Sequence, residues 1–265
     1  AMTETPVDPA AAAAPADPGA AEGRPRPLFY TRPALIEARS HGRLGLAPHD
    51  GYGFAAGAAA IPVTVTEFAR AALTYPIVFA GHGERLSPVA VTGLRRDENL
   101  FVDAAGAWSP DAYVPGYARR YPFLLVRTDA GGEKVALCAD LDSPRLAEDA
   151  GAALFEDGRP SKVAEDALEF CLAYQRQAMA SEVIATTLRE LGVLVPQEGE
   201  VKLPSGESLR LTDFQVVDEA KLNALSEADW LKLRACGGVA AAYCHLVSLG
   251  NWSRLSRLAE ARRAG

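Results

Sequence analysis

The hydrophobic and polar positions follow two different rhythms along the chain. Between residues 28 and 142, short apolar runs alternate with polar turns, a spacing that is typical of antiparallel strands joined by hairpins. Between residues 143 and 265, apolar residues recur every three or four positions, the period of amphipathic helices. The pattern predicts an α+β fold in which a β-rich N-terminal part, with an antiparallel curved sheet, packs against a helical C-terminal part.

The β-rich part contains several apolar runs that predict short strands. They cover residues 61–65, 77–80, 88–91, 99–102, 122–126 and 134–138. Gly with polar residues separates 77–80 from 88–91 and also 122–126 from 134–138, so we expect two hairpins. Thr66 is a candidate cap for a short helix over residues 67–73.

The helical part begins with one long pattern. Apolar residues at helical spacing run from about residue 161 to Leu191 and end at Gly192, with a possible break around residues 179–181. A small β-hairpin insertion follows. Its predicted strands cover residues 201–203, 209–211 and 214–217. Three helices complete the chain, beginning after Ser226, Gly238 and Asn251.

Composition sets the first residues apart from the rest. Residues 1–27 are rich in Ala and Pro and nearly free of bulky apolar side chains, so they cannot bury enough surface to offset the entropy of ordering them. We expect a flexible tail there. Residues 28–265 are expected to form a single domain, with its β-rich part at 28–142 and its helical part at 143–265.

Charge and cysteine content exclude several classes of protein. The chain carries 27 Lys and Arg against 34 Asp and Glu, a net charge of −7, so it lacks the generally basic surface of a nucleic-acid-binding protein. No apolar run approaches the roughly 20 residues that a transmembrane helix needs. The four Cys residues form no CxxC pair, and the simplest interpretation is a reduced, cytoplasmic protein.

Several stretches resemble one known family. The strings YPIVF (75–79), PVAVTGLRRDENLFVDAAGAW (88–108) and YVPGYARRYPF (113–123) closely resemble the SapC family of bacterial proteins. The resemblance continues over residues 154–161, 214–225 and 241–255, and covers nearly everything from Pro27 onward. It implies a link to bacterial surface layers and to genes for outer-membrane receptors, halogenases and cupin-like hydroxylases. It brings no established catalytic residues.

One segment of the resembling region carries the sharpest candidate binding site. The candidate ligand-binding residues are Trp108, Tyr113, Tyr117, Arg119, Arg120 and Tyr121. Arg stacks on aromatic rings and grips carboxylate or phosphate groups with a two-pronged fork, so this set could line a groove for a peptide or an anionic metabolite. The alternative is that the rings fill the core and that the Arg residues pair with nearby Asp and Glu.

The histidines offer an enzymatic alternative. His82, Glu84, His245 and Arg254 follow the His-x-Asp/Glu…His…Arg order of non-haem iron(II), 2-oxoglutarate oxygenases, in which two His and a carboxylate hold the metal. The long gap before His245 and its place in a helical pattern argue against this. We therefore expect neither metal nor cofactor, with Fe(II) at His82, Glu84 and His245 as the alternative.

The last predicted helix is basic. It contains Arg254, Arg257, Arg262 and Arg263 against the single acidic residue Glu260. Together with Trp252, this excess could dock a partner or an anionic surface. A solvated face with basic residues near the helix C-terminus is the alternative.

The sequence thus predicts a bacterial accessory or binding protein rather than an enzyme. We expect a protein, peptide or anionic metabolite as its partner, and no nucleic acid. A metal-dependent oxygenase is the second hypothesis, and a structural role in a surface layer is the third.

Overall fold

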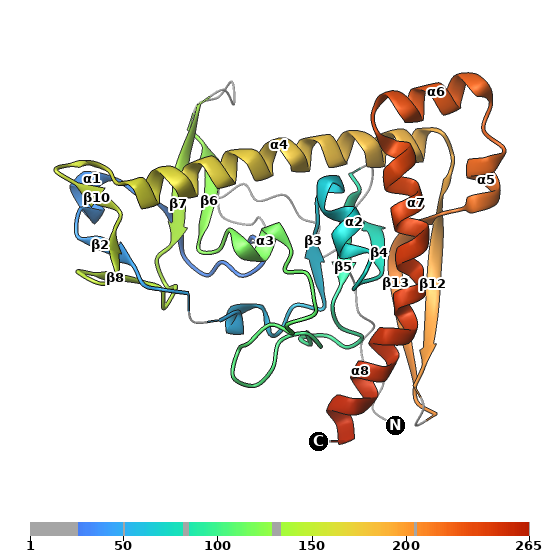
Figure 1. Cartoon of the computed structure of the whole chain (residues 1–265), viewed down its shortest axis with the longest axis horizontal. Coiled ribbons are helices and arrows are strands. Elements are labelled where there is room, and N and C mark those ends of the chain that lie inside the picture. The colour runs from blue at the N-terminus through green and yellow to red at the C-terminus, as the bar shows by residue number, and fades with distance from the viewer. Residues whose placement is uncertain (1–25, 50, 82–84, 129–133, 204–205, 265) are drawn as a thin grey trace. The chain divides into compact units, whose positions relative to one another are not determined.

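The computed structural model describes residues 26–49, 51–81, 85–128, 134–203 and 206–264, and it combines antiparallel sheets with helices (Figure 1). The predicted α+β class is therefore confirmed. The chain separates into two compact units. Among the described residues, unit 1 contains 52–116 and 177–264, and unit 2 contains 26–51 and 117–176. No helix among the described residues combines the length and apolar composition of a membrane span.

Unit 1 is built on a five-stranded antiparallel sheet in the order β12-β13-β4-β5-β3. Its strands are β3 (Ala60–Pro62), β4 (Ile77–Ala80), β5 (Ser87–Val91), β12 (Leu194–Lys202) and β13 (Ser208–Val217). The predicted hairpin of β4 and β5 is confirmed, with Ile77 opposite Ala90. The β12–β13 hairpin, predicted as a small insertion after the long helix, is longer than expected. Phe214 of β13 pairs with Ala80 of β4, so this hairpin extends the sheet.

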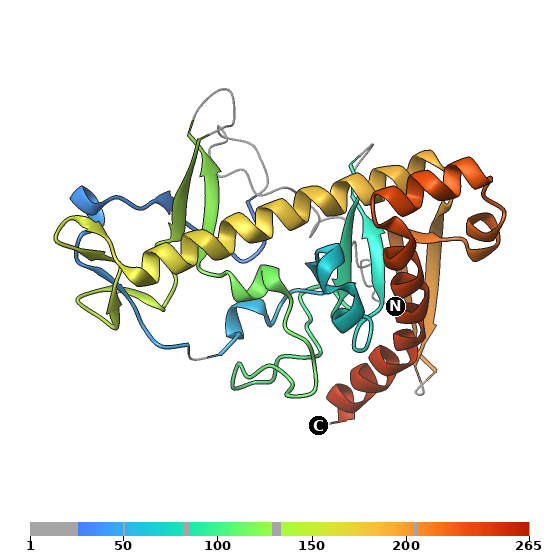
Figure 2. The ribbon, with the colours of Figure 1, turned by 45° about the horizontal axis from the view of Figure 1, so that its top comes forward.

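Helices surround the sheet of unit 1. They are α2 (Phe68–Ala71), α5 (Glu219–Asn223), α6 (Glu227–Ala235), α7 (Gly238–Ser248) and α8 (Trp252–Ala264). The predicted cap of α6 is confirmed, because the Ser226 side chain accepts a hydrogen bond from the Asp229 amide. Helix α7 packs against β13 and β4, and both views show it running beside β13 (Figures 1 and 2).

Helix α4 (Lys162–Glu190) is the long predicted helix, and it runs without the expected break at residues 179–181. Ser181 explains why the helix continues there. Its hydroxyl donates to the Gln177 carbonyl one turn earlier and accepts a hydrogen bond from the Val65 amide, so it satisfies polar groups without interrupting the helix. Residues of α4 up to Arg176 belong to unit 2, and the remainder belongs to unit 1.

Unit 2 contains shorter strands around a small core. One sheet has the order β1-β7-β6, with β1 at Pro33–Leu35, β7 at Val135–Asp140 and β6 at Phe123–Arg127. A second sheet has the order β8-β2-β9, with β8 at Leu146–Glu148, β2 at Leu44–Leu46 and β9 at Ala152–Ala153. Unit 2 also contains a two-stranded hairpin, formed by β10 (Phe155–Glu156) and β11 (Arg159–Pro160), and the helices α1 (Ala38–His41) and α3 (Gly116–Arg119). Gly116, the first residue of α3, belongs to unit 1. The predicted hairpin of β6 and β7 is confirmed. The core of unit 2 contains Phe123 of β6, Ala139 of β7, and Ala164 and Cys171 of α4.

Three local expectations are corrected. The helix predicted for residues 67–73 is shorter, covering Phe68–Ala71, and Thr66 does not cap it. Thr64 instead caps the 3-10 turn Val65–Glu67 that precedes this helix, where it forms a capping box with Glu67. Residues 99–102 form no strand beyond an isolated bridge between Val102 and Trp108. Asn251 does not cap α8 through its side chain, because its amide donates to the Ala72 and Tyr75 carbonyls.

Candidate functional site

The aromatic and Arg segment divides between the two units. Trp108 and Tyr113 lie in unit 1, whereas Tyr117, Arg119, Arg120 and Tyr121 lie in unit 2. A single groove lined by all six residues therefore stays a prediction. The structure does show what each side chain contacts within its own unit.

In unit 1 the polar tips of the ring side chains are used in hydrogen bonds. Trp108 is buried, and its indole nitrogen donates to the Tyr75 hydroxyl at 3.1 Å. Tyr75 in turn donates to the Tyr113 carbonyl, and the Tyr113 hydroxyl donates to Oε1 of Glu67 at 2.9 Å. These contacts hold the segment in place and leave little hydrogen-bonding capacity for a ligand.

Glu67 is a buried carboxylate whose two oxygens are both satisfied. Oε1 accepts from the Tyr113 hydroxyl and from the Gly116 amide, at 2.9 and 2.6 Å. Oε2 accepts from the amide and the hydroxyl of Thr64, at 2.8 and 2.9 Å. A buried charge with this many donors is stable in the interior, so Glu67 is a structural clamp.

Two tyrosines of unit 2 are engaged in the same way. The Tyr117 hydroxyl donates to the Leu28 carbonyl at 3.3 Å. The Tyr121 hydroxyl donates to Asp140 at 3.1 Å, and that buried carboxylate also accepts from the amides of Thr31 and Arg32. The predicted binding residues Tyr117 and Tyr121 thus have internal partners for their hydroxyls.

Arg120 is different. Only 9 % of it is exposed, and its guanidinium lies among three tyrosine rings, with centroids 4.1 Å away at Tyr117, 4.7 Å at Tyr174 and 5.9 Å at Tyr30. Nε and Nη2 are buried, and neither forms a hydrogen bond to any part of the chain that the structure describes. Cation–π contact stabilises the charge but leaves these two N–H groups without acceptors. We call Arg120 with these three tyrosines the Arg120 cage.

The surroundings of Arg120 supply no negative charge at neutral pH. Burial raises the pKa of Tyr30 and of Tyr117, and it raises the pKa of the nearby Cys171 thiol to about 11. These groups are therefore uncharged. Burial lowers the pKa of Arg120, but at the high pH where its neighbouring tyrosines ionise, their negative charge raises it more, so the pKa lies above its ordinary value and the side chain stays cationic. The cage holds a cation without a counter-ion among the described residues.

Arg119 points elsewhere. It is exposed, and its guanidinium lies 5.4 Å from the centroid of the Phe170 ring on α4. Two adjacent arginines of the candidate segment therefore have opposite environments. The sequence made both arginines candidate binding residues, and only the structure distinguishes them, because it buries Arg120 and leaves Arg119 exposed.

The predicted iron ligands are only partly visible. His82 and Glu84 lie outside the described residues. His245 is fully buried in α7, its Nε2 accepts a hydrogen bond from the Val217 amide at 3.0 Å, and burial lowers its pKa to about 4. The described part of the chain contains no group of three or more His, Cys, Asp and Glu residues that could hold a metal ion. His245 is thus a neutral core residue that is hydrogen-bonded at Nε2, whereas its buried Nδ1 has no hydrogen-bond partner among the described residues.

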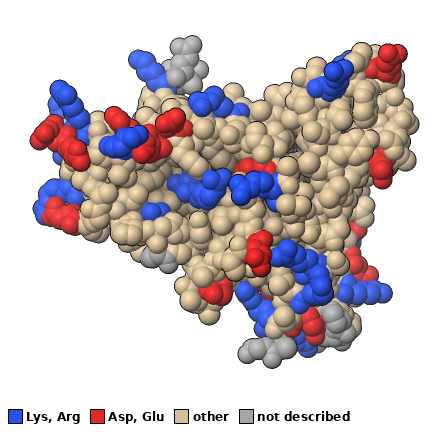
Figure 3. Space-filling view, viewed as in Figure 1, with Lys and Arg blue, Asp and Glu red and all other residues tan. Residues whose placement is uncertain are grey.

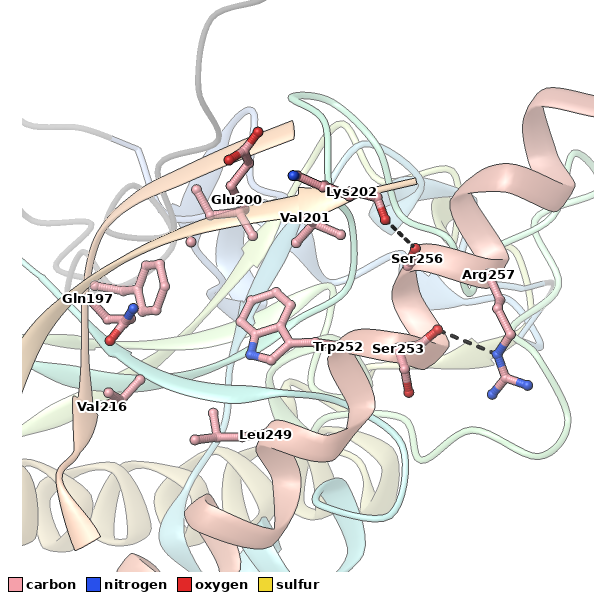
Figure 4. A pocket seen from close by; sticks show the side chains of 13 residues that line it. Gln197, Glu200, Val201, Lys202, Val216, Leu249, Trp252, Ser253, Ser256 and Arg257 are labelled. Atoms are coloured by element: carbon pink, nitrogen blue, oxygen red, sulfur yellow. Dashed lines mark hydrogen bonds between the residues drawn. The ribbon is translucent and has the colours of Figure 1, made fainter. Parts of the chain in front are cut away.

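A cavity of about 700 Å³ lies elsewhere in unit 1, between the β12–β13 hairpin and the start of α8 (Figure 4). We call it the Trp252 groove. Val201, Phe214 and Val216 of the hairpin and Leu249 before α8 form apolar walls. The volume lies within the usual range for small-molecule sites. The sequence pointed to Trp252 and the basic helix, but the opposing wall depends on where the hairpin packs.

The four arginines of α8 are in different states. Arg254 lies 5.8 Å from the Phe101 ring centroid, Arg262 donates to the carbonyls of Asn99 and Val102, and Arg263 pairs with Glu207 at 3.1 Å. Lys and Arg side chains gather over α8, with a few acidic residues among them (Figure 3). Arg257 has no carboxylate partner within the described ranges of the chain.

Comparison with known proteins gives one informative match. The family model described as SapC matches residues 36–255. No curated protein and no solved structure gives a significant match to the chain. The match includes both compact units except for the described residues before Ile36 and after Leu255.

Proposed function

Because the chain belongs to the SapC family, whose name specifies no activity, we propose its function from the Arg120 cage: the protein binds an anionic ligand through Arg120. The observation that carries this proposal is the pair of buried guanidinium nitrogens, Nε and Nη2, that have no hydrogen-bond acceptor among the described residues. A carboxylate or phosphate group presents two oxygens at the spacing of these two N–H groups, so it would satisfy both at once.

The energetic argument favours a ligand over a purely structural role. Burying a charged group without hydrogen-bond partners costs free energy, and the cost is recovered when an anion supplies charge-assisted hydrogen bonds. Tyr117 and Tyr174 would add flat faces against which an unsaturated or planar anion packs. Since both nitrogens are buried, binding requires that the cover of the guanidinium open locally.

The test compares Arg120 with its exposed neighbour. Thermal unfolding of the wild type is measured in acetate and in inorganic phosphate, against chloride at the same ionic strength. We expect at least one of the two anions to raise the melting temperature, by roughly 5–10 °C if it reaches about 100 times its Kd. The shift should vanish in Arg120→Met and persist in Arg119→Met.

Two results would contradict the proposal. One is the absence of any anion-specific shift in the wild type, because acetate and phosphate carry the chemistry that the cage would recognise. The other is an equal shift in Arg120→Met and Arg119→Met, which would assign the effect to surface charge.

A further inference from the structure

The Trp252 groove is a second candidate site in unit 1, and its argument is independent of the Arg120 cage. Its walls are apolar, and the Trp252 ring stands 6.2 Å from the Phe214 ring between centroids. Figure 4 shows Val201 pointing toward Trp252, while the Glu200 carboxylate points away from it. An occupant would therefore meet mainly apolar side chains along the hairpin.

Gly199 leaves the floor of the groove open. A Cβ atom added there would lie 3.8 Å from the Phe214 side chain and 4.0 Å from that of Leu211, which is ordinary van der Waals contact. The glycine is thus not required by its backbone angles or by crowding. Its missing side chain leaves space over the apolar floor, and a larger residue at this position would occupy that space.

Three side chains that line the groove, those of Trp252, Lys202 and Arg257, carry N–H groups that donate no hydrogen bond to a described residue. The indole N–H of Trp252 forms no hydrogen bond to a described residue. Arg257 lies five residues further along α8, roughly 7.5 Å at the rise of a helix, and only its Nε is engaged, with the Ser253 carbonyl at 3.4 Å. By contrast, the hydroxyls of Ser253 and Ser256 are already bonded within the chain. The unused groups are donors, and those of Lys202 and Arg257 are cationic.

We infer that the Trp252 groove binds an amphipathic carboxylate, with its apolar body between Trp252 and the hairpin and its carboxylate at Arg257. Apolar walls select the body, and the unpaired guanidinium selects an anionic head by charge complementarity. The volume of about 700 Å³ accommodates a medium-chain acyl group or a comparable aromatic body.

The first experiment blocks the groove. Binding of the fluorescent anion 8-anilinonaphthalene-1-sulfonate to the full chain is titrated, and dodecanoate is then added as competitor. We expect dodecanoate to displace the probe from the wild type. Gly199→Leu should weaken binding of both compounds at least ~10-fold, because the new side chain fills the floor. Glu198→Leu adds the same side chain to the same strand outside the lining, and should bind as the wild type does.

The second experiment tests the head group and does not depend on Gly199→Leu folding. Arg257 is exposed, so Arg257→Met should fold normally. We expect it to weaken dodecanoate about 10-fold while leaving dodecan-1-ol unchanged, because only the carboxylate uses the guanidinium. The inference is overturned if folded Gly199→Leu binds the probe as Glu198→Leu does, or if Arg257→Met weakens dodecanoate and dodecan-1-ol equally. It is also overturned if dodecanoate fails to displace the probe.

Discussion

Glu67 in unit 1 and Arg120 in unit 2 are both buried charged side chains, and they solve the problem of burial differently. Glu67 accepts four hydrogen bonds, from Thr64, Tyr113 and Gly116. Arg120 has aromatic faces around it, but two of its nitrogens lack acceptors among the described residues. A satisfied buried charge holds a fold together, whereas an unsatisfied one leaves interaction energy available to a ligand.

The difference matters because both residues contact the same short stretch of sequence. Tyr113 and Tyr117 look alike in the sequence, as aromatic residues four positions apart. In the structure one completes the clamp at Glu67, and the other forms part of the Arg120 cage. Aromatic and Arg density therefore pointed to a segment that contains both kinds of residue, but it did not distinguish the support from the candidate site.

The largest effect should come from removing the satisfied charge. Glu67→Ala leaves the Tyr113 hydroxyl and the Thr64 and Gly116 amides without their acceptor in the interior, so we expect a loss of about 3–5 kcal/mol in the free energy of unfolding. Urea unfolding monitored by circular dichroism measures it. Glu67→Gln keeps the volume and one acceptor oxygen, and should lose less. A stability of Glu67→Ala equal to that of the wild type would show that Glu67 is no clamp.

A buried group that stays neutral gives the next largest effect. Burial lowers the pKa of His245 to about 4 in the folded chain, below its ordinary value of 6.5. Between these values the unfolded chain binds more protons, so stability rises with pH and is lost as pH falls from about 6.5 to 4. The full loss is roughly 3 kcal/mol.

The measurement for His245 is urea unfolding at pH 7, 5.5 and 4. His245→Gln retains an acceptor for the Val217 amide but does not titrate. The difference in stability between wild type and variant should therefore shrink or reverse as the pH falls. A difference that is constant over this range would mean that His245 titrates normally in the folded chain.

The smallest effect is expected at Arg120 itself. Without added anion, Arg120→Met replaces an incompletely bonded cation by an apolar side chain of similar length, so we expect stability within about 1 kcal/mol of the wild type, or above it. Unfolding in chloride buffer measures this. A loss as large as that of Glu67→Ala would show that the three tyrosine rings satisfy Arg120 by themselves, and the comparison between the two charges would then fail.

Local signals in the sequence predicted much of the fold. Ser226 before Asp229 marks the start of α6, and apolar runs of four or five residues beside Gly-containing turns mark two hairpins. Each of these features depends on residues close together in the chain. The chain passes between the compact units after Gly51, Gly116 and Arg176. Pro115 and Gly116 give a local turn signal at the second of these boundaries, but the third falls inside α4, where no proline or glycine marks it. The single domain expected over residues 28–265 stays a prediction.

The sequence by itself determined the α+β class, the principal helices and hairpins, the family, and the segment that contains Arg120. Tertiary structure alone decided that β13 pairs with β4, that Arg120 is buried while Arg119 is exposed, and that Trp252 faces the hairpin across a cavity. The physical reason is the distance along the chain over which each kind of interaction acts. Periodicity, capping and turn chemistry act over a few residues, whereas burial and hydrogen-bond satisfaction depend on partners up to 179 residues away, as between Asn251 and Ala72.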